Sequence, residues 1–124
     1  MLRACALIIL SFSLQAFAEV PDINEMRKSV VGAAQVMQSQ DSFSERMDSI
    51  VSLKSILGPM HANNSDITMK AHEAQNFYYA VLPVLEIQSE KDCRAVMNQV
   101  SQGRTPEKKS HEHYAMRLLG ALCN

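Results

Sequence analysis

Residues that bend or break a chain are scarce in this sequence. It contains only four glycines and four prolines, it has no tryptophan, and other aromatic residues are few. Apolar residues recur at a helical spacing almost throughout, and no stretch alternates polar and apolar residues as a half-buried strand would. We therefore expect an all-α fold, and the length of 124 residues fits one domain.

A strong charge of either sign is also absent. The chain carries 12 basic and 13 acidic residues, for a formal net charge of −1. Because nucleic-acid-binding proteins show a clustered basic excess, we expect no nucleic-acid partner. After residue 18, no apolar run approaches the ~20 residues that a transmembrane helix needs. We therefore expect no stable membrane insertion of residues 19–124.

The N-terminus has the three parts of a secretory signal peptide. A basic start, Met1-Leu2-Arg3, precedes the apolar stretch 4–17, and Ala16-Phe17-Ala18 supplies small residues at the −3 and −1 positions. We predict that residues 1–18 are a signal peptide cleaved before Glu19. Residues 19–124 are then a single helical domain in the periplasm or secreted from the cell.

Two other interpretations of the N-terminus fit less well. Ser11, Ser13 and Gln15 interrupt the apolar stretch, which is too short for a membrane anchor. A lipoprotein signal places its cysteine after the apolar region, whereas Cys5 precedes it. The N-terminus therefore favours export with cleavage.

Few cysteines remain after that cleavage. The chain has three, and Cys5 leaves with the signal peptide. In an exported protein the remaining pair, Cys93 and Cys123, predicts a disulfide bond. Closing a loop of about 30 residues would contribute roughly 3–4 kcal/mol to a domain whose small core makes it only marginally stable.

Caps and apolar stripes divide residues 19–124 into five predicted helices. The first begins at Asp22, with Glu25 three residues on. The second follows a capping box of Ser42 and Glu45, and we predict that Gly58-Pro59 ends it. The predicted buried stripes are Ile23, Met26, Val30, Ala33, Ala34 and Met37 on the first helix, and Phe43, Met47, Ile50, Val51, Leu53 and Leu57 on the second.

The third and fourth helices follow an asparagine-rich loop at 60–65. The third begins at Ser65 or Asp66, and Pro83 either kinks it or ends it just before that residue. The fourth begins at Ser89, with Asp92 completing the cap, and ends at Gly103. Their predicted apolar stripes are Ile67, Ala71, Ala74, Phe77, Tyr78, Val81, Leu82 and Leu85 on the third helix, and Cys93, Val96, Met97 and Val100 on the fourth.

The last helix has two candidate starts. Thr105-Pro106 offers a cap followed by proline at the first helical position, and Ser110 offers a later cap. A bond between Cys93 and Cys123 would make the last two helices an antiparallel hairpin pinned at its open end. At 1.5 Å per residue, the fourth helix spans ~14 Å from Cys93 to Gln102, whereas the last helix spans ~26 Å from Pro106 to Cys123 or ~20 Å from Ser110 to Cys123. The late start gives two helices of more similar length, so we predict that the last helix begins at Ser110 and that 103–109 form a basic loop.

Motifs for catalysis are absent from the sequence. There is no nucleophile elbow, paired-histidine metalloprotease motif, phosphate loop or dinucleotide fingerprint. Cys93 and Cys123 also lack the Cys-x-x-Cys spacing of a redox-active pair. We expect a protein that is not an enzyme and needs no cofactor.

Soft metal ligands at helical spacing offer one chemical alternative. Met69 with His72, and His113 with Met116, are i, i+3 pairs, and thioether plus imidazole suits copper(I). The competing interpretation is that methionines fill the core and that histidines near the start of the last helix, such as His111, are exposed. The alternative function is thus a periplasmic copper-binding protein that uses the two pairs.

Protein binding is the function class that the remaining features favour. Within Phe77-Tyr78-Tyr79 the first two residues fit the buried stripe, so we expect Tyr79 to face outward, and tyrosine is favoured at binding hot spots. A basic run that contains Arg104, Lys108 and Lys109 could meet an acidic partner or membrane phosphate, although such runs are usually solvated loops. We predict a non-catalytic inhibitor, immunity or assembly-type factor whose protein partner the sequence does not identify.

The layout of a signal peptide, a helical domain and a late cysteine that closes the final helix is similar to that of periplasmic immunity proteins that neutralise secreted cell-wall amidases. This similarity covers residues 93–123.

Overall fold

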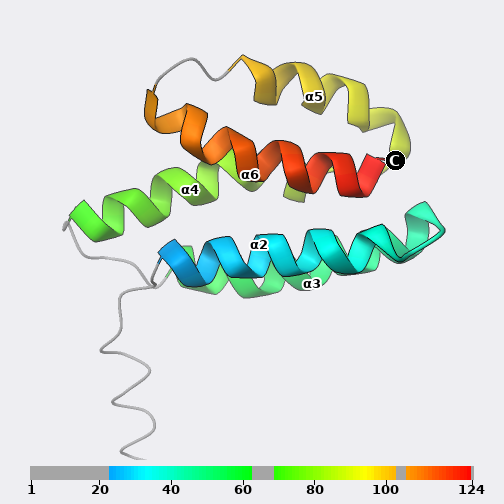
Figure 1. The fold of residues 1–124 in the computed structure, drawn as a ribbon, viewed down its shortest axis with the longest axis horizontal. Helices are drawn as coiled ribbons and strands as arrows, with labels where there is room; N and C mark the ends of the chain where they lie inside the picture. Colours follow the sequence, from blue (N-terminus) through cyan, green and yellow to red (C-terminus); the bar gives the residue numbers. More distant parts are fainter. Residues whose placement is uncertain (1–22, 63–68, 103–105, 124) are drawn as a thin grey trace, which may run out of the picture.

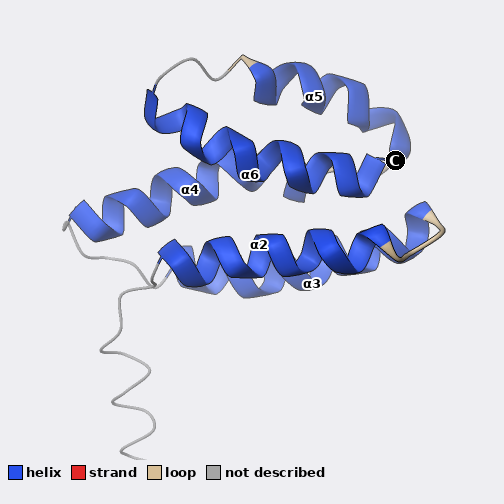
Figure 2. Ribbon diagram, in the orientation of Figure 1, coloured by secondary structure: helices blue, strands red, loops and turns tan. Residues whose placement is uncertain are grey.

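The computed structural model describes residues 23–62, 69–102 and 106–123, and the side chains of 23–60, 71–102 and 111–123. The described chain is all-α, as predicted, with five α-helices, one short 3₁₀ helix and no strand among these residues (Figure 1, Figure 2). Helices α2, α4 and α6 run in one direction, and α3 and α5 run in the other (Figure 1). The elements are α2 (Ile23–Gln38), α3 (Phe43–Ala62), α4 (Met69–Leu85), η1 (Glu90–Asp92), α5 (Cys93–Ser101) and α6 (Pro106–Cys123).

The core is built around α6. This helix packs against α2, α4 and α5, and less extensively against α3. Its residues Ala115, Leu118, Leu119 and Leu122 are fully buried, at the i, i+3, i+4, i+7 spacing of one helix face. The helices around it contribute the predicted stripes, with Met26, Val30, Ala34 and Met37 on α2, Ile50, Leu53 and Leu57 on α3, and Ala71, Ala74, Phe77, Val81 and Leu85 on α4 all buried.

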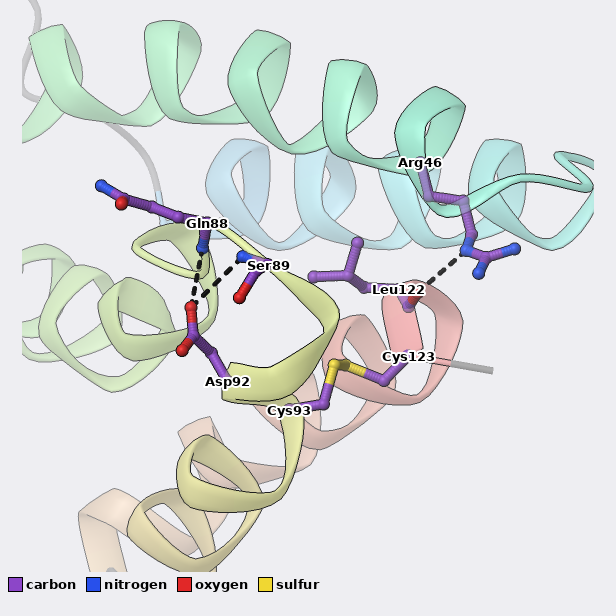
Figure 3. The surroundings of a disulfide bond; sticks show 7 residues. All are labelled: Arg46, Gln88, Ser89, Asp92, Cys93, Leu122 and Cys123. Atoms are coloured by element: carbon purple, nitrogen blue, oxygen red, sulfur yellow. Dashed lines mark hydrogen bonds between the residues drawn. A yellow bond between two sulfur atoms is a disulfide. The ribbon is translucent and has the colours of Figure 1, made fainter.

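The predicted Cys93–Cys123 disulfide is present. It joins the first residue of α5 to the last residue of α6, with the two Cα atoms 6.1 Å apart (Figure 3). The two helices contact each other and run in opposite directions (Figure 1). The disulfide-pinned antiparallel hairpin is therefore confirmed.

Two predicted caps are also in place. The backbone N–H of Glu45 donates to Ser42 Oγ (3.1 Å), and the Ser42 hydroxyl donates to Glu45 Oε1 (3.2 Å). Ahead of α5, Asp92 Oδ2 accepts hydrogen bonds from the backbone N–H groups of Gln88 and Ser89, both at 3.2 Å (Figure 3). These bonds satisfy backbone donors that would otherwise lack partners at a helix start.

Prolines end neither of the helices that contain them. The prediction that Gly58-Pro59 ends α3 is wrong, because α3 continues to Ala62. Gly58 does not adopt the positive φ of a helix-terminating glycine, and Pro59 lies in the last turns, where it removes only one intrahelical hydrogen bond. Likewise α4 does not end before Pro83 but continues to Leu85.

The start of α6 also differs from the prediction. The helix begins at Pro106, so the preference for Ser110 is wrong, and Lys108 and Lys109 lie in the helix instead of a loop. The expected match in length considered only α5, whereas α6 also packs against α4. His111, expected to be exposed, is buried there, with its ring edge-on to Phe77 at 5.5 Å between centroids.

The predicted buried stripe of α3 includes a residue that is exposed in the structure. Val51 is among the exposed large apolar side chains, because it lies about 100° around the helix from the buried Ile50. Met97 on α5 is also exposed, whereas Val84 and Ile87 near the end of α4 are buried without having been predicted.

Arg46 links α3 to the end of α6, a role that was not predicted from the sequence. The Arg46 side chain is only 8% exposed. Its Nε donates to the backbone oxygen of Leu122 (2.8 Å; Figure 3), and its Nη1 donates to the backbone oxygen of Gln40 (3.1 Å). A cation at this position also complements the negative end of the α6 dipole.

Candidate protein-binding surface

An open groove of about 400 Å³ lies between α2 and α3, and we call it the α2–α3 groove. Its lining is mainly apolar. Helix α2 supplies Ser29, Gly32, Ala33 and Val36, and helix α3 supplies Asp48, Ser49, Ser52, Leu53 and Ile56.

The two ends of the groove differ because α2 and α3 run in opposite directions (Figure 1). Val36 stands toward the end that carries Asp48, where Ser49 Oγ donates to Gln40 Oε1 (3.0 Å). Ile56 stands toward the other end. The side chains of Val36 and Ile56 are 52% and 49% exposed. Small side chains occupy the space between them.

Gly32 opens the floor of this groove. It lies inside α2 and does not adopt a positive φ, and a Cβ atom added to it would meet nothing within 4 Å. Glycine in a helix interior costs about 1 kcal/mol relative to alanine. Neither backbone conformation nor packing in the described structure requires glycine here. Because Gly32 has no side chain, the helix backbone is accessible here and another chain can approach it closely.

Asp48 is the charged residue among those that line the groove. It is exposed and stands at the Val36 end, so the groove is electrostatically asymmetric along its length. A cationic group on a bound chain would be favoured at this end, and such a pair near the surface contributes orientation more than affinity.

The aromatic cluster of α4 is oriented as predicted. Phe77 is fully buried, Tyr78 is partly buried, and Tyr79 is 57% exposed. The rings of Tyr78 and Tyr79 meet edge to face with centroids 5.9 Å apart. Tyr79 is not part of the α2–α3 groove, and its role in binding a partner stays a prediction.

The basic residues predicted to bind a partner are only partly covered by the structure. Arg104 lies outside the described residues. Lys108 and Lys109 belong to the first turn of α6, and their side chains are outside the described set.

The predicted copper ligands come from two helices. His72 on α4 and His113 on α6 are exposed, whereas Met116 is partly buried against the core. Met69 is the first residue of α4, and its side chain is outside the described set. Among the residues whose side chains are described, no group of three or more His, Cys, Asp or Glu residues could hold a metal ion.

The two methionine–histidine pairs lie at different levels of the bundle. Phe77 on α4 meets Tyr114 on α6 with ring centroids 5.5 Å apart, and the two helices run in the same direction (Figure 1). Met69 precedes Phe77 by about 12 Å along its helix, whereas Met116 follows Tyr114. The copper site stays a prediction, which titration of residues 19–124 with copper(I) against a competing chelator would test.

The α2–α3 groove was not predicted from the sequence, although one signal was available. Gly32 and Ala33 are small residues inside an otherwise regular helix, and a glycine there weakens the helix without forming a turn. Comparison with known proteins found no matching family model, no matching curated protein and no matching solved structure.

Proposed function

We propose that this protein is an exported, non-catalytic module that binds another protein through the α2–α3 groove, as an inhibitor, immunity or assembly-type factor. The observation that carries this proposal is the groove itself, in which two half-exposed aliphatic side chains, Val36 and Ile56, flank a floor of small residues. An exposed apolar surface with a polar rim is typical of an interaction site.

The occupant that fits this groove is one amphipathic helix of the partner. From Ser29 to Val36 the groove extends about 10 Å along α2, which matches about two helical turns. The open backbone at Gly32 lets a helix approach closely, and Val36 and Ile56 provide apolar contacts at either end. Asp48 favours a lysine or arginine at one end of the incoming helix. This is helix-in-groove recognition, in which successive turns supply the anchoring side chains.

Filling the groove is expected to abolish binding. Residues 19–124 are immobilised as the wild type, Gly32→Leu or Gly58→Leu, and the proteins captured from envelope extracts are quantified by mass spectrometry. Gly58 is the matched control, because it is also a helical glycine at which an added Cβ meets nothing within 4 Å, and it does not line the groove. The partner should be captured equally by wild type and Gly58→Leu, and at least about tenfold less by Gly32→Leu, a loss of ~1.4 kcal/mol.

Equal capture by Gly32→Leu would exclude the groove as the binding surface. Tyr79→Ala belongs in the same assay, because loss of capture with that variant alone would place the interface on α4. Absence of any protein that wild type enriches over bare resin would contradict the proposed function.

Export is the second part of the proposal. The Cys93–Cys123 disulfide is consistent with an oxidising, extracytoplasmic compartment. In the described part of the chain, none of the helices combines the length and the apolar character required to cross a bilayer. The proposed signal peptide, residues 1–18, lies outside the described residues.

Expression of the full sequence in a Gram-negative host is expected to yield a periplasmic protein that begins at Glu19. Intact mass and N-terminal sequencing measure the cleavage, and thiol alkylation measures whether Cys93 and Cys123 are oxidised. Ala18→Phe should block processing, because the −1 position of a cleavage site requires a small residue. A cytoplasmic, uncleaved protein with both thiols free would contradict export.

A further inference from the structure

Helix α5 is the least buried helix of the bundle. It has nine residues, and Val100 is its one buried side chain. Val96 and Cys93 are only partly buried. Its contacts are chiefly with α4 and α6, and Figure 1 shows it on the far side of α6 from α2 and α3. A helix this short is not stable on its own in water, so its attachment decides whether it forms.

Helix α5 contributes only Val100 to the buried cluster of the core. The largest fully buried side chains all belong to α2, α3, α4 and α6, and none of them lies on α5. They include Met26, Ile50, Phe77 and Leu119, one from each of these four helices. Loss of α5 would therefore expose the edge of the core without removing its centre.

The C-terminus of α6 has a second attachment that does not involve the disulfide. Arg46 Nε on α3 donates to the backbone oxygen of Leu122, next to Cys123 (Figure 3). On the other side of the disulfide, the hydrogen bonds of Asp92 reach only to Gln88 and Ser89, so they shape the turn before α5 without tying α5 to α6. After the sulfur–sulfur bond is broken, the end of α6 is still held by Arg46, whereas the start of α5 has lost its covalent link to α6.

We propose that the Cys93–Cys123 disulfide is a latch: its reduction by a dithiol, either a small molecule or a dithiol oxidoreductase, releases α5 while α2, α3, α4 and α6 stay folded. Both cysteines are partly exposed. A thiolate of the dithiol attacks one sulfur, the Cys93–Cys123 bond breaks, and a mixed disulfide forms. The second thiol of the reductant then displaces the remaining cysteine. Two electrons and two protons pass to Cys93 and Cys123, and the reductant becomes a disulfide.

Release uncovers the surfaces of α4 and α6 against which Val96 and Val100 pack. The reduced protein therefore exposes apolar area that the oxidised protein covers, at a place separate from the α2–α3 groove. The latch is independent of the proposed function, because it depends only on how α5 is held.

Hydrogen exchange measured by mass spectrometry tests the latch on residues 19–124. The oxidised protein, the protein reduced with dithiothreitol, and the Cys93→Ser/Cys123→Ser double variant without reductant are compared. In the reduced and double-variant forms, amides 93–101 should exchange at least about tenfold faster and lose most of their protection, whereas the core amides of α2, α3, α4 and α6 should remain protected.

Unchanged exchange in α5 would overturn the latch, because packing alone would then hold the helix. Faster exchange across all helices, with loss of the helical circular dichroism signal, would also overturn it, since the disulfide would then support the entire fold. The double variant separates reduction of the bond from other effects of the reductant.

Discussion

Replacing Arg46 with alanine is expected to lower the free energy of unfolding by about 2–4 kcal/mol. The guanidinium is buried and donates to the backbone oxygens of Leu122 and Gln40, so its removal leaves two acceptors without this donor and opens a gap between α3 and the end of α6. Urea denaturation followed by circular dichroism measures the loss. Arg46→Lys keeps the charge but cannot reach both oxygens in the same planar geometry, and it should recover only part of the stability.

Arg27 provides the matched control for this prediction. Arg46 has its guanidinium carbon 6.0 Å from the centroid of Phe43, and Arg27 has its own 5.7 Å from the centroid of Tyr114. The Nη1 hydrogen bond of Arg27 to Asn24, however, is exposed and long at 3.4 Å. Arg27→Ala should therefore cost less than about 1 kcal/mol. If Arg46→Ala and Arg27→Ala lowered the free energy of unfolding equally, burial and the two backbone hydrogen bonds of Arg46 would not explain its effect.

Replacing Phe77 with alanine is expected to cost about 3–5 kcal/mol, a large part of the stability of a small domain. The ring is fully buried, and it meets His111 and Tyr114 edge to face, each at 5.5 Å between centroids. The substitution loses the transfer free energy of the ring, leaves a cavity between α4 and α6, and removes both aromatic contacts. The same urea denaturation experiment measures it.

Two comparisons make the Phe77 prediction specific. Phe77→Leu retains most of the volume and should lose less than about 1.5 kcal/mol. Tyr79→Ala, two residues along the same helix but exposed, should change the stability by no more than about 0.5 kcal/mol. A loss below about 2 kcal/mol for Phe77→Ala would show that α4 and α6 collapse into the cavity.

Helices α2 and α3, which line the groove, lie on the opposite side of α6 from α5 (Figure 1). Gly32→Leu tests the groove without touching the disulfide, and the cysteine double variant tests the latch without touching the groove. A protein captured by both the oxidised and the reduced chain, but not by Gly32→Leu, would be a partner of the groove alone. A partner captured only after reduction would belong to the surface beneath α5.

Local features were predictable from the sequence because their causes are local. Ser42 and Glu45 are three residues apart, so their mutual hydrogen bonds follow from the backbone geometry of any helix start. The disulfide was also predictable, since the assumption of export left only Cys93 and Cys123 to pair. The outward orientation of Tyr79 followed from the helical period once Phe77 was placed in the core.

Features that depend on neighbours distant in the sequence were missed or mistaken. The start of α6 was misplaced because its length was compared with α5 alone, although α6 also packs against α2 and α4. The burial of Arg46 depends on the end of α6, 76 residues further along the chain. The α2–α3 groove exists only because two helices place small residues opposite each other.

Spacing along the chain was enough to establish the all-α class, the five helices and most of the buried stripes, because helical period and capping are local patterns. The disulfide followed because only two cysteines remained to pair. The packing of whole helices decided which arginine is buried and which apolar side chains stay exposed. These outcomes escaped prediction because contacts between residues distant in the sequence outweigh local preferences worth about 1 kcal/mol or less.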